Sequence, residues 1–105
     1  MTTPALTGLT SAQRDAALER AVATVERNIT AFGSAYPDDT TRANVYPPRR
    51  HAGYPEGANV GWTTGFWPGM LWLAYEYNGR EVFHAAGLRQ VESFGRRIED
   101  RVDIA

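Results

Sequence analysis

The sequence contains no cysteine and no lysine, and each absence removes a group of functions. Without cysteine, the chain can form neither a disulfide bond nor a metal site built on thiolates. All 11 basic residues are therefore arginines, and 12 acidic residues oppose them, which leaves a formal net charge of -1. This balance argues against a nucleic-acid-binding surface and against attraction to an anionic membrane.

Long hydrophobic runs are also missing. The longest apolar run, Met70 to Tyr75, is far shorter than the ~18 residues of a membrane span. The start, Met1 to Leu6, lacks the basic beginning and the apolar core of a signal peptide. His51 and His84 each lack a second ligand at a useful spacing, which argues against a metal site. We therefore expect a soluble, cytoplasmic protein that binds no nucleic acid, membrane, metal or cofactor.

One stretch, residues 62–77, holds all three tryptophans and predicts the central helix of the chain. Thr63 and Thr64 are suited to cap its start, and Asn78-Gly79 should end it because glycine accepts a left-handed conformation. The expected helix runs from about residue 64 to residue 77. Its apolar side chains surround it, which is typical of a helix buried on nearly all sides. The side chains assigned to the core are Trp67, Met70, Trp72 and Leu73.

Two amphipathic segments flank this central helix. The first begins at a capping box formed by Thr10 and Gln13, and it ends at Gly33. Its apolar positions recur at spacings of three and four: Leu18, Val22, Val25, Ile29 and Phe32. The second begins at Arg80-Glu81, and its apolar stripe consists of Phe83, Gly87, Val91, Phe94 and Ile98. The positions assigned to solvent on this second helix are Arg89, Gln90, Glu92, Arg96 and Arg97.

The remaining segments have neither a helical nor a strand period. Residues 33–61 are rich in proline and glycine and carry tyrosines at 36, 46 and 54, which favours a long ordered loop that packs against or covers something. Within it, Asp38-Asp39 is typical of turn chemistry, and Arg49-Arg50 of solvated charge. Residues 1–10 are expected to form a linker.

The length and the helix order together predict the fold. A chain of 105 residues, with 43% hydrophobic and 22% charged residues, indicates a single soluble domain, 1–105. An outer–inner–outer order of about three helices is typical of an α/α toroid, so we expect an all-α arc of such a ring. Two outer helices cannot surround the inner one. Some of its side chains should therefore stay partly exposed and favour self-association, with Phe66, Trp67, Met70 and Tyr77 as the candidates.

The tract from Asn59 to Asn78, NVGWTTGFWPGMLWLAYEYN, resembles the first inner helix of glycoside hydrolase family 88. That family comprises the unsaturated glucuronyl hydrolases, whose fold is an (α/α)6 barrel. The opening helix, the Tyr/Pro-rich loop and the closing tract 96–104 extend the likeness over most of the chain. In the family, this closing tract leads into a His-Asp motif whose Asp is the catalytic acid/base. A second important Asp lies further on in the family. The resemblance therefore implies that both of these carboxylates lie beyond residue 105, that no residue here is catalytic, and that this chain alone is inactive.

The resemblance also implies a substrate class and a reaction. Family 88 enzymes hydrate the vinyl ether of a 4,5-unsaturated glucuronyl oligosaccharide: an Asp protonates C4, water adds at C5, and the hemiketal collapses to release the next sugar. This route differs from direct protonation of the glycosidic oxygen, although it still needs a carboxyl group with a matched pKa. Two residues carry over as substrate contacts at the mouth of the inner helix, Trp62 and Phe66. From the residues alone, packing is the favoured interpretation of both, and the resemblance makes substrate contact an equally good one.

Two other functions remain open at this stage. One is another α/α-toroid sugar enzyme, such as an unsaturated rhamnogalacturonyl hydrolase or a sugar epimerase, which Gly65-Phe66-Trp67-Pro68-Gly69 disfavours. The other is a non-catalytic helical module that acts by contact. The coding sequence downstream of Ala105 would separate these readings, because an immediate His-Asp would support the hydrolase.

Overall fold

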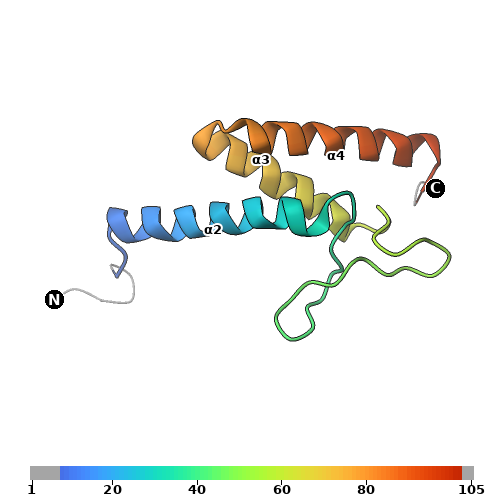
Figure 1. The fold of residues 1–105 in the computed structure, drawn as a ribbon, viewed down its shortest axis with the longest axis horizontal. Helices are drawn as coiled ribbons and strands as arrows, with labels where there is room; N and C mark the ends of the chain where they lie inside the picture. The colour runs from blue at the N-terminus through green and yellow to red at the C-terminus, as the bar shows by residue number, and fades with distance from the viewer. Residues whose placement is uncertain (1–7, 103–105) are drawn as a thin grey trace.

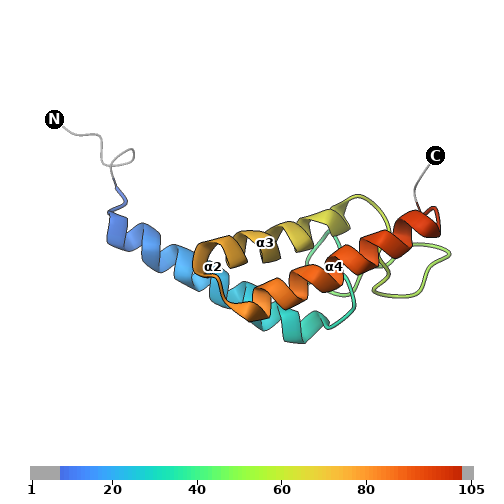
Figure 2. The same ribbon diagram turned by 90° about the horizontal axis from the view of Figure 1, so that it is seen from above.

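The computed structural model describes residues 8–102, and over these residues the protein is built from helices. Helix α2 spans Ser11–Phe32, a 3-10 turn η1 spans Thr63–Gly65, α3 spans Phe66–Asn78 and α4 spans Glu81–Glu99. Helix α3 lies between α2 and α4 and runs opposite to both (Figure 1). The view from above shows α3 and α4 as an antiparallel hairpin, with α2 along one side (Figure 2). The predicted all-α class and the three long helices are confirmed for this part of the chain.

Helix α2 begins as its sequence predicts. The Thr10 hydroxyl accepts a hydrogen bond from the Gln13 backbone N–H at 3.1 Å, and the Gln13 side chain accepts one from the Thr10 N–H at 2.8 Å. The first half of α2 extends past the ends of the other helices (Figure 2), and Val22 is its first buried residue. The assignment of Leu18 to the apolar face that packs is therefore wrong, because 45% of it remains exposed.

Helix α3 ends where the sequence predicts but starts differently. Gly79 adopts the left-handed conformation, with φ of 68°, and its N–H donates to the Tyr75 carbonyl at 2.6 Å. Neither Thr63 nor Thr64 caps the helix; a 3-10 turn precedes α3, and the Thr64 hydroxyl instead donates to Asn59 Oδ1 at 2.7 Å. The threonines thus serve the loop rather than the helix end.

The core lies where α3 meets α2, α4 and the start of the loop. Its buried members are Val22, Tyr36, Trp67, Leu71, Ala74, Phe83 and Ala86. Trp67 is buried as expected, and Trp72 is half-buried. Met70 and Leu73 were also assigned to the core, which is wrong: they are 43% and 67% exposed because no described element covers that side of α3. Of the four residues predicted to stay partly exposed, Phe66 and Met70 are exposed and Tyr77 is half-buried, while Trp67 is not exposed.

The buried face of α4 is rotated from the predicted stripe. Phe83, Ala86, Gly87 and Gln90 are buried, whereas Val91 and Ile98 are 59% and 65% exposed. Gln90 was assigned to solvent, but the buried Tyr36 hydroxyl donates a hydrogen bond to its Oε1. A polar residue can occupy this packed face because a partner from the loop satisfies it.

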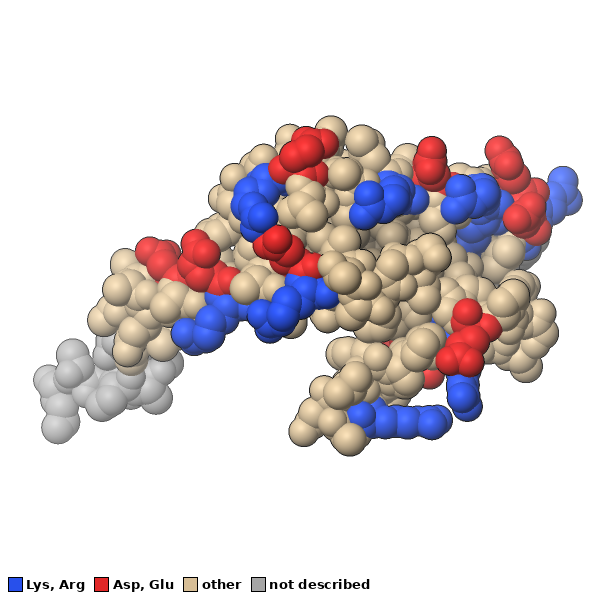
Figure 3. All heavy atoms as spheres, in the orientation of Figure 1, with Lys and Arg blue, Asp and Glu red and all other residues tan. Residues whose placement is uncertain are grey.

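Two polar contacts fasten α2 to the α3–α4 hairpin. Arg80 forms a two-pronged ion pair with Glu26, which lowers the pKa of that carboxyl. The Tyr77 hydroxyl donates to Glu19 at 2.7 Å, and this hydrogen bond raises the pKa of Tyr77. Figure 3 shows charges of both signs interspersed along α2 and α4, which agrees with the balanced composition. None of the helices in the described range is long and apolar enough to cross a membrane.

The segment between α2 and η1 forms neither helix nor strand, and its pairing is limited to the isolated bridges Pro37–Pro48 and Arg42–Val45. It is nevertheless tied together, since the Arg49 N–H donates to the Tyr36 carbonyl at 2.7 Å. Arg49 was predicted to be solvated, which is wrong: it is 7% exposed and acts as an internal partner for the loop. The linker assigned to residues 1–10 lies mostly outside the described residues.

Candidate functional site

A groove of about 840 Å³ opens between the second half of α2, the start of the loop and the beginning of α3. Trp62 and Phe66, the two predicted substrate contacts, lie together on its wall with ring centroids 5.7 Å apart and an edge-to-face angle of 68°. They are 78% and 61% exposed. Two large aromatic side chains are therefore exposed to solvent at the N-terminal end of α3, where they contribute little to the core.

The groove carries polar groups beside these rings. Thr24 and Asn28 come from α2, and Asp38, Asp39 and Thr40 come from the start of the loop. Hydrogen-bonding groups beside aromatic faces suit a sugar, because its C–H faces stack on rings while its hydroxyls bond to oxygen and nitrogen atoms. The arrangement can hold a carbohydrate.

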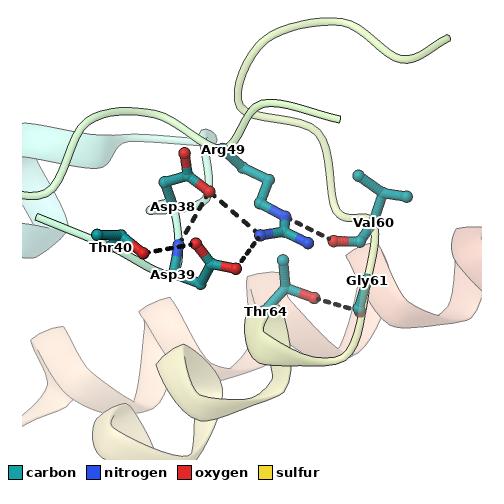
Figure 4. Close-up of polar contacts among 7 residues, drawn as sticks. All are labelled: Asp38, Asp39, Thr40, Arg49, Val60, Gly61 and Thr64. Atoms are coloured by element: carbon teal, nitrogen blue, oxygen red, sulfur yellow. Dashed lines mark hydrogen bonds and ion pairs between the residues drawn. The ribbon is translucent and has the colours of Figure 1, made fainter. Parts of the chain in front are cut away.

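One carboxylate of the groove, Asp39, has its charged form stabilised by its neighbours. The Thr40 hydroxyl donates to Asp39 at 3.1 Å and, together with Arg49, holds the pKa of Asp39 below its usual 3.8 despite opposing desolvation. Arg49 Nη1 lies 3.1 Å from Asp38 Oδ1 and 3.3 Å from Asp39 Oδ2 (Figure 4). The guanidinium therefore offsets much of the negative charge that Asp38 and Asp39 bring to the groove. Asp38-Asp39 was predicted to serve turn chemistry; it also forms this ion pair.

A second polar network holds the segment that carries Trp62. The side chain of Arg97 donates to Asn59 Oδ1 and to the Thr64 hydroxyl, each at 3.1 Å. Asn59 also donates to Ser93 of α4 at 3.2 Å. Arg97 had been assigned to solvent with Arg96, and its half-buried role was missed because its partners are more than thirty positions away in the chain. The unusual composition of the stretch Asn59–Thr64 was the sequence signal that could have indicated buried polar partners for Arg97.

Thr63 adds one unsatisfied group to the groove. Its hydroxyl oxygen is buried and has no hydrogen-bond partner among residues 8–102, although the residue lines the groove beside Trp62. A buried hydroxyl without a partner is costly, so this spot has unused hydrogen-bonding capacity.

Neither histidine lines the groove. His84 stacks on Tyr75 with centroids 5.1 Å apart and pairs with Glu81 at 3.1 Å, at the closed end of the α3–α4 hairpin. Among the described residues, no group of three His, Cys, Asp or Glu side chains converges on a point that could hold a metal ion.

Comparison with models of known protein families gives no match, but comparison with individual proteins does. The unsaturated chondroitin disaccharide hydrolase of Streptococcus agalactiae is 37% identical over 94 residues, which cover 90% of this chain and 22% of the relative. The unsaturated glucuronyl hydrolase of Bacillus sp. is 35% identical over 83 residues, 79% of this chain and 20% of the relative. A solved mutant of the Streptococcus agalactiae unsaturated glucuronyl hydrolase, complexed with dGlcA-GalNAc6S, has a TM-score of 0.78 and 36% identity, covering 92% of this chain and 24% of that one.

Over the part that these alignments cover, this chain is similar in sequence and in helical fold to unsaturated glucuronyl hydrolases, which are glycoside hydrolases. The chain spans about 22% of the length of the curated relatives it matches, so it corresponds to a part of such an enzyme.

Proposed function

We propose that this chain is the N-terminal arc of an (α/α)6 toroid of glycoside hydrolase family 88, and that it supplies part of the binding site for an unsaturated uronyl oligosaccharide. The observation that carries the proposal is the pair Trp62 and Phe66, which are exposed on one groove although they belong to a tract that resembles the family's first inner helix. The names of the relatives and the disaccharide complexed with one of them support the same substrate class. A cytoplasmic location stays a prediction.

The groove offers two interactions to such a sugar. The rings of Trp62 and Phe66 present apolar surface on which the C–H faces of the sugar can stack. Such stacking on an aromatic ring contributes ~0.5–1.5 kcal/mol of binding free energy beyond burial. The start of α3 lies beside them and has no acidic residue in its first turn, and the positive end of the helix dipole favours an anionic ligand such as a uronate.

The reaction itself requires a carboxyl group outside these residues. A carboxylic acid gives its proton to C4 of the 4,5-unsaturated sugar, the oxygen of water bonds to C5, and water loses a proton to a base. The resulting hemiketal opens and expels the next sugar as an alcohol. In this proposal the chain binds and orients the sugar, while residues absent from these 105 carry the proton.

Binding tests the part assigned to this chain. Titration with a 4,5-unsaturated uronyl disaccharide, followed by tryptophan fluorescence, should show saturable binding. Trp62→Ala should weaken it by about 2- to 10-fold, the equivalent of the aromatic term, and leave the helical content unchanged because the side chain is 78% exposed. Leu88→Ala on α4 is the matched exposed control and should bind normally. Unchanged affinity in Trp62→Ala would remove Trp62 from the site.

Activity tests the placement of the acid. Because no carboxyl group of the chain is assigned to proton donation, the 105 residues should not reduce the ultraviolet absorbance of the disaccharide double bond. Turnover clearly above that of a heat-killed sample would show that the proton donor lies within this chain.

A further inference from the structure

Arg49 is a charged side chain held inside the loop, where a charge needs several partners. Only 7% of it is exposed. Its Nε donates to the Val60 carbonyl at 3.0 Å, while Nη1 faces Asp38 and Asp39 (Figure 4). Burial of a guanidinium is tolerated when its donors are paired in this way. The guanidinium group of one arginine therefore joins two loop segments that are more than twenty positions apart.

The second of these segments leads directly into Trp62. Gly61 has φ of 85°, which favours glycine, and a Cβ at that position would overlap the Arg49 guanidinium. The backbone at Val60 and Gly61 is thus packed against Arg49 and hydrogen-bonded to it. Nothing comparable holds the ring of Trp62 itself, which is 78% exposed and contacts Phe66.

The following turn is fixed from the opposite side. The Thr64 hydroxyl lies 3.3 Å from the Gly61 carbonyl (Figure 4). It also lies 2.7 Å from Asn59 Oδ1. These contacts hold the end of the segment to α4 through Arg97, whereas Val60 is held by its buried side chain, by its N–H bond to the Ala58 carbonyl and by the bond that its own carbonyl accepts from Arg49. Two polar side chains, Arg97 and Arg49, therefore anchor the segment that carries Trp62, and Arg49 is the anchor on the side of Asp38 and Asp39.

We propose that Arg49 is a positioning residue: it fixes Val60 and Gly61 so that Trp62 stands at the mouth of the groove, and it offsets Asp38 and Asp39 so that an anionic sugar can enter. The second half rests on the function proposed above. A uronate beside two uncompensated carboxylates would meet like-charge repulsion, whereas a paired aspartate repels it less. Arg49 thus links the shape of the binding platform to the charge of the wall beside it.

Arg49→Lys separates this role from simple stability. Lysine keeps the positive charge beside Asp38 and Asp39, so the loop retains an ion pair, but one ammonium group cannot reproduce the fork that also reaches the Val60 carbonyl. Arg50→Lys is the matched control, since it makes the same change at the adjacent, exposed position. Backbone ¹⁵N relaxation of the whole chain reports the result residue by residue.

In the native chain, the order parameters of Gly61 and Trp62 should lie near the rigid value of about 0.85, and in Arg49→Lys they should fall towards or below about 0.6. Leu71 and Phe83, which are fully buried, should keep their values in both variants. Arg50→Lys should match the native chain throughout. A rigid Trp62 in folded Arg49→Lys would overturn the proposal, and so would an equal loss at Leu71 and Phe83, because Arg49 would then act on global stability alone.

Ligand binding completes the test. Arg49→Lys should weaken binding of the unsaturated uronyl disaccharide by about the same 2- to 10-fold as Trp62→Ala, and the double variant should lose little more, since both changes remove one interaction. Full additivity of the two losses would refute the link between Arg49 and Trp62. If the native chain does not bind the disaccharide while Arg49→Lys still loosens Trp62, the proposed function fails and the positioning of Trp62 stands.

Discussion

At Gly87, helix α4 packs closely against Trp72 of α3. A Cβ added there would lie 2.7 Å from both Cε2 and Cζ2 of Trp72, closer than real carbon contacts allow. Gly87→Ala should therefore force the indole to move, an overpacking cost of ~1–3 kcal/mol. The substitution also replaces a glycine within a helix by alanine, and this replacement by itself stabilises a helix by ~0.5–1 kcal/mol. The steric cost should exceed this gain.

Gly95→Ala is the control that isolates the steric effect. Gly95 also lies inside α4, and nothing comes within 4 Å of a Cβ built there, so only the gain in helix propensity applies. The difference in unfolding free energy between the two variants should therefore equal the overpacking cost, about 1–3 kcal/mol, measured by urea denaturation followed by circular dichroism in dilute solution. In a Trp72→Leu background this difference should largely vanish. Equal stability of Gly87→Ala and Gly95→Ala would refute the packing described for Trp72.

Two further predictions concern local structure. Thr10→Ala should remove the capping box at a cost of ~0.5–2 kcal/mol, but because Val22 is the first buried residue of α2, amide exchange should rise only in the first turns, and loss of protection at Val22 would contradict this. Thr40→Val should raise the lowered pKa of Asp39 in a carboxyl NMR titration, since the Thr40 hydroxyl is the largest cause of the shift. Because the pKa is lowered in the folded state, the stability linked to Asp39 is present above pH 3.8 and is lost as the pH falls through the folded-state value. An unchanged titration would exclude Thr40 as the cause.

Features that depend on neighbours in the sequence were predictable. The Thr10–Gln13 capping box, the left-handed Gly79 and the starts of α2 and α4 follow from local backbone chemistry, and the structure confirms them. The composition of α3 also indicated that its large side chains exceed what nearby helices can cover. Phe66 and Met70 are accordingly exposed.

Features that depend on partners distant in the sequence were not predictable. Nothing local distinguishes Arg49 from Arg50, because burial of the first is decided by Asp38 and by a carbonyl eleven positions away. Gln90 is buried because Tyr36 reaches it across 54 positions. In the candidate site, Trp62 and Phe66 came from resemblance to a family, whereas their anchors and the acidic wall required the fold of the loop.

The exposed side of α3 leads to a last prediction, self-association of the chain. The exposed side chains lie at spacings of four, four and three, and so form one stripe: Trp62, Phe66, Met70 and Leu73. Two aromatic side chains alone bury ~150–250 Å² each when covered, so the stripe approaches the several hundred Å² typical of interaction surfaces. Each large side chain left in water forgoes ~1.5–3 kcal/mol, which a second copy can recover by placing the same stripe against it.

Sedimentation velocity over a range of concentrations measures this association. Phe66→Gln with Leu73→Gln should convert the chain to a monomer, because both changes place a polar side chain in the stripe. The control, Leu88→Gln with Val91→Gln, removes two comparably exposed side chains from α4, where the charged Arg89 and Glu92 interrupt the apolar surface. This control should still associate. A native chain that stays monomeric at every concentration, binds no hydrophobic dye and melts in one sharp transition would show that α3 tolerates its open side, and a self-standing helical module would then explain the chain better.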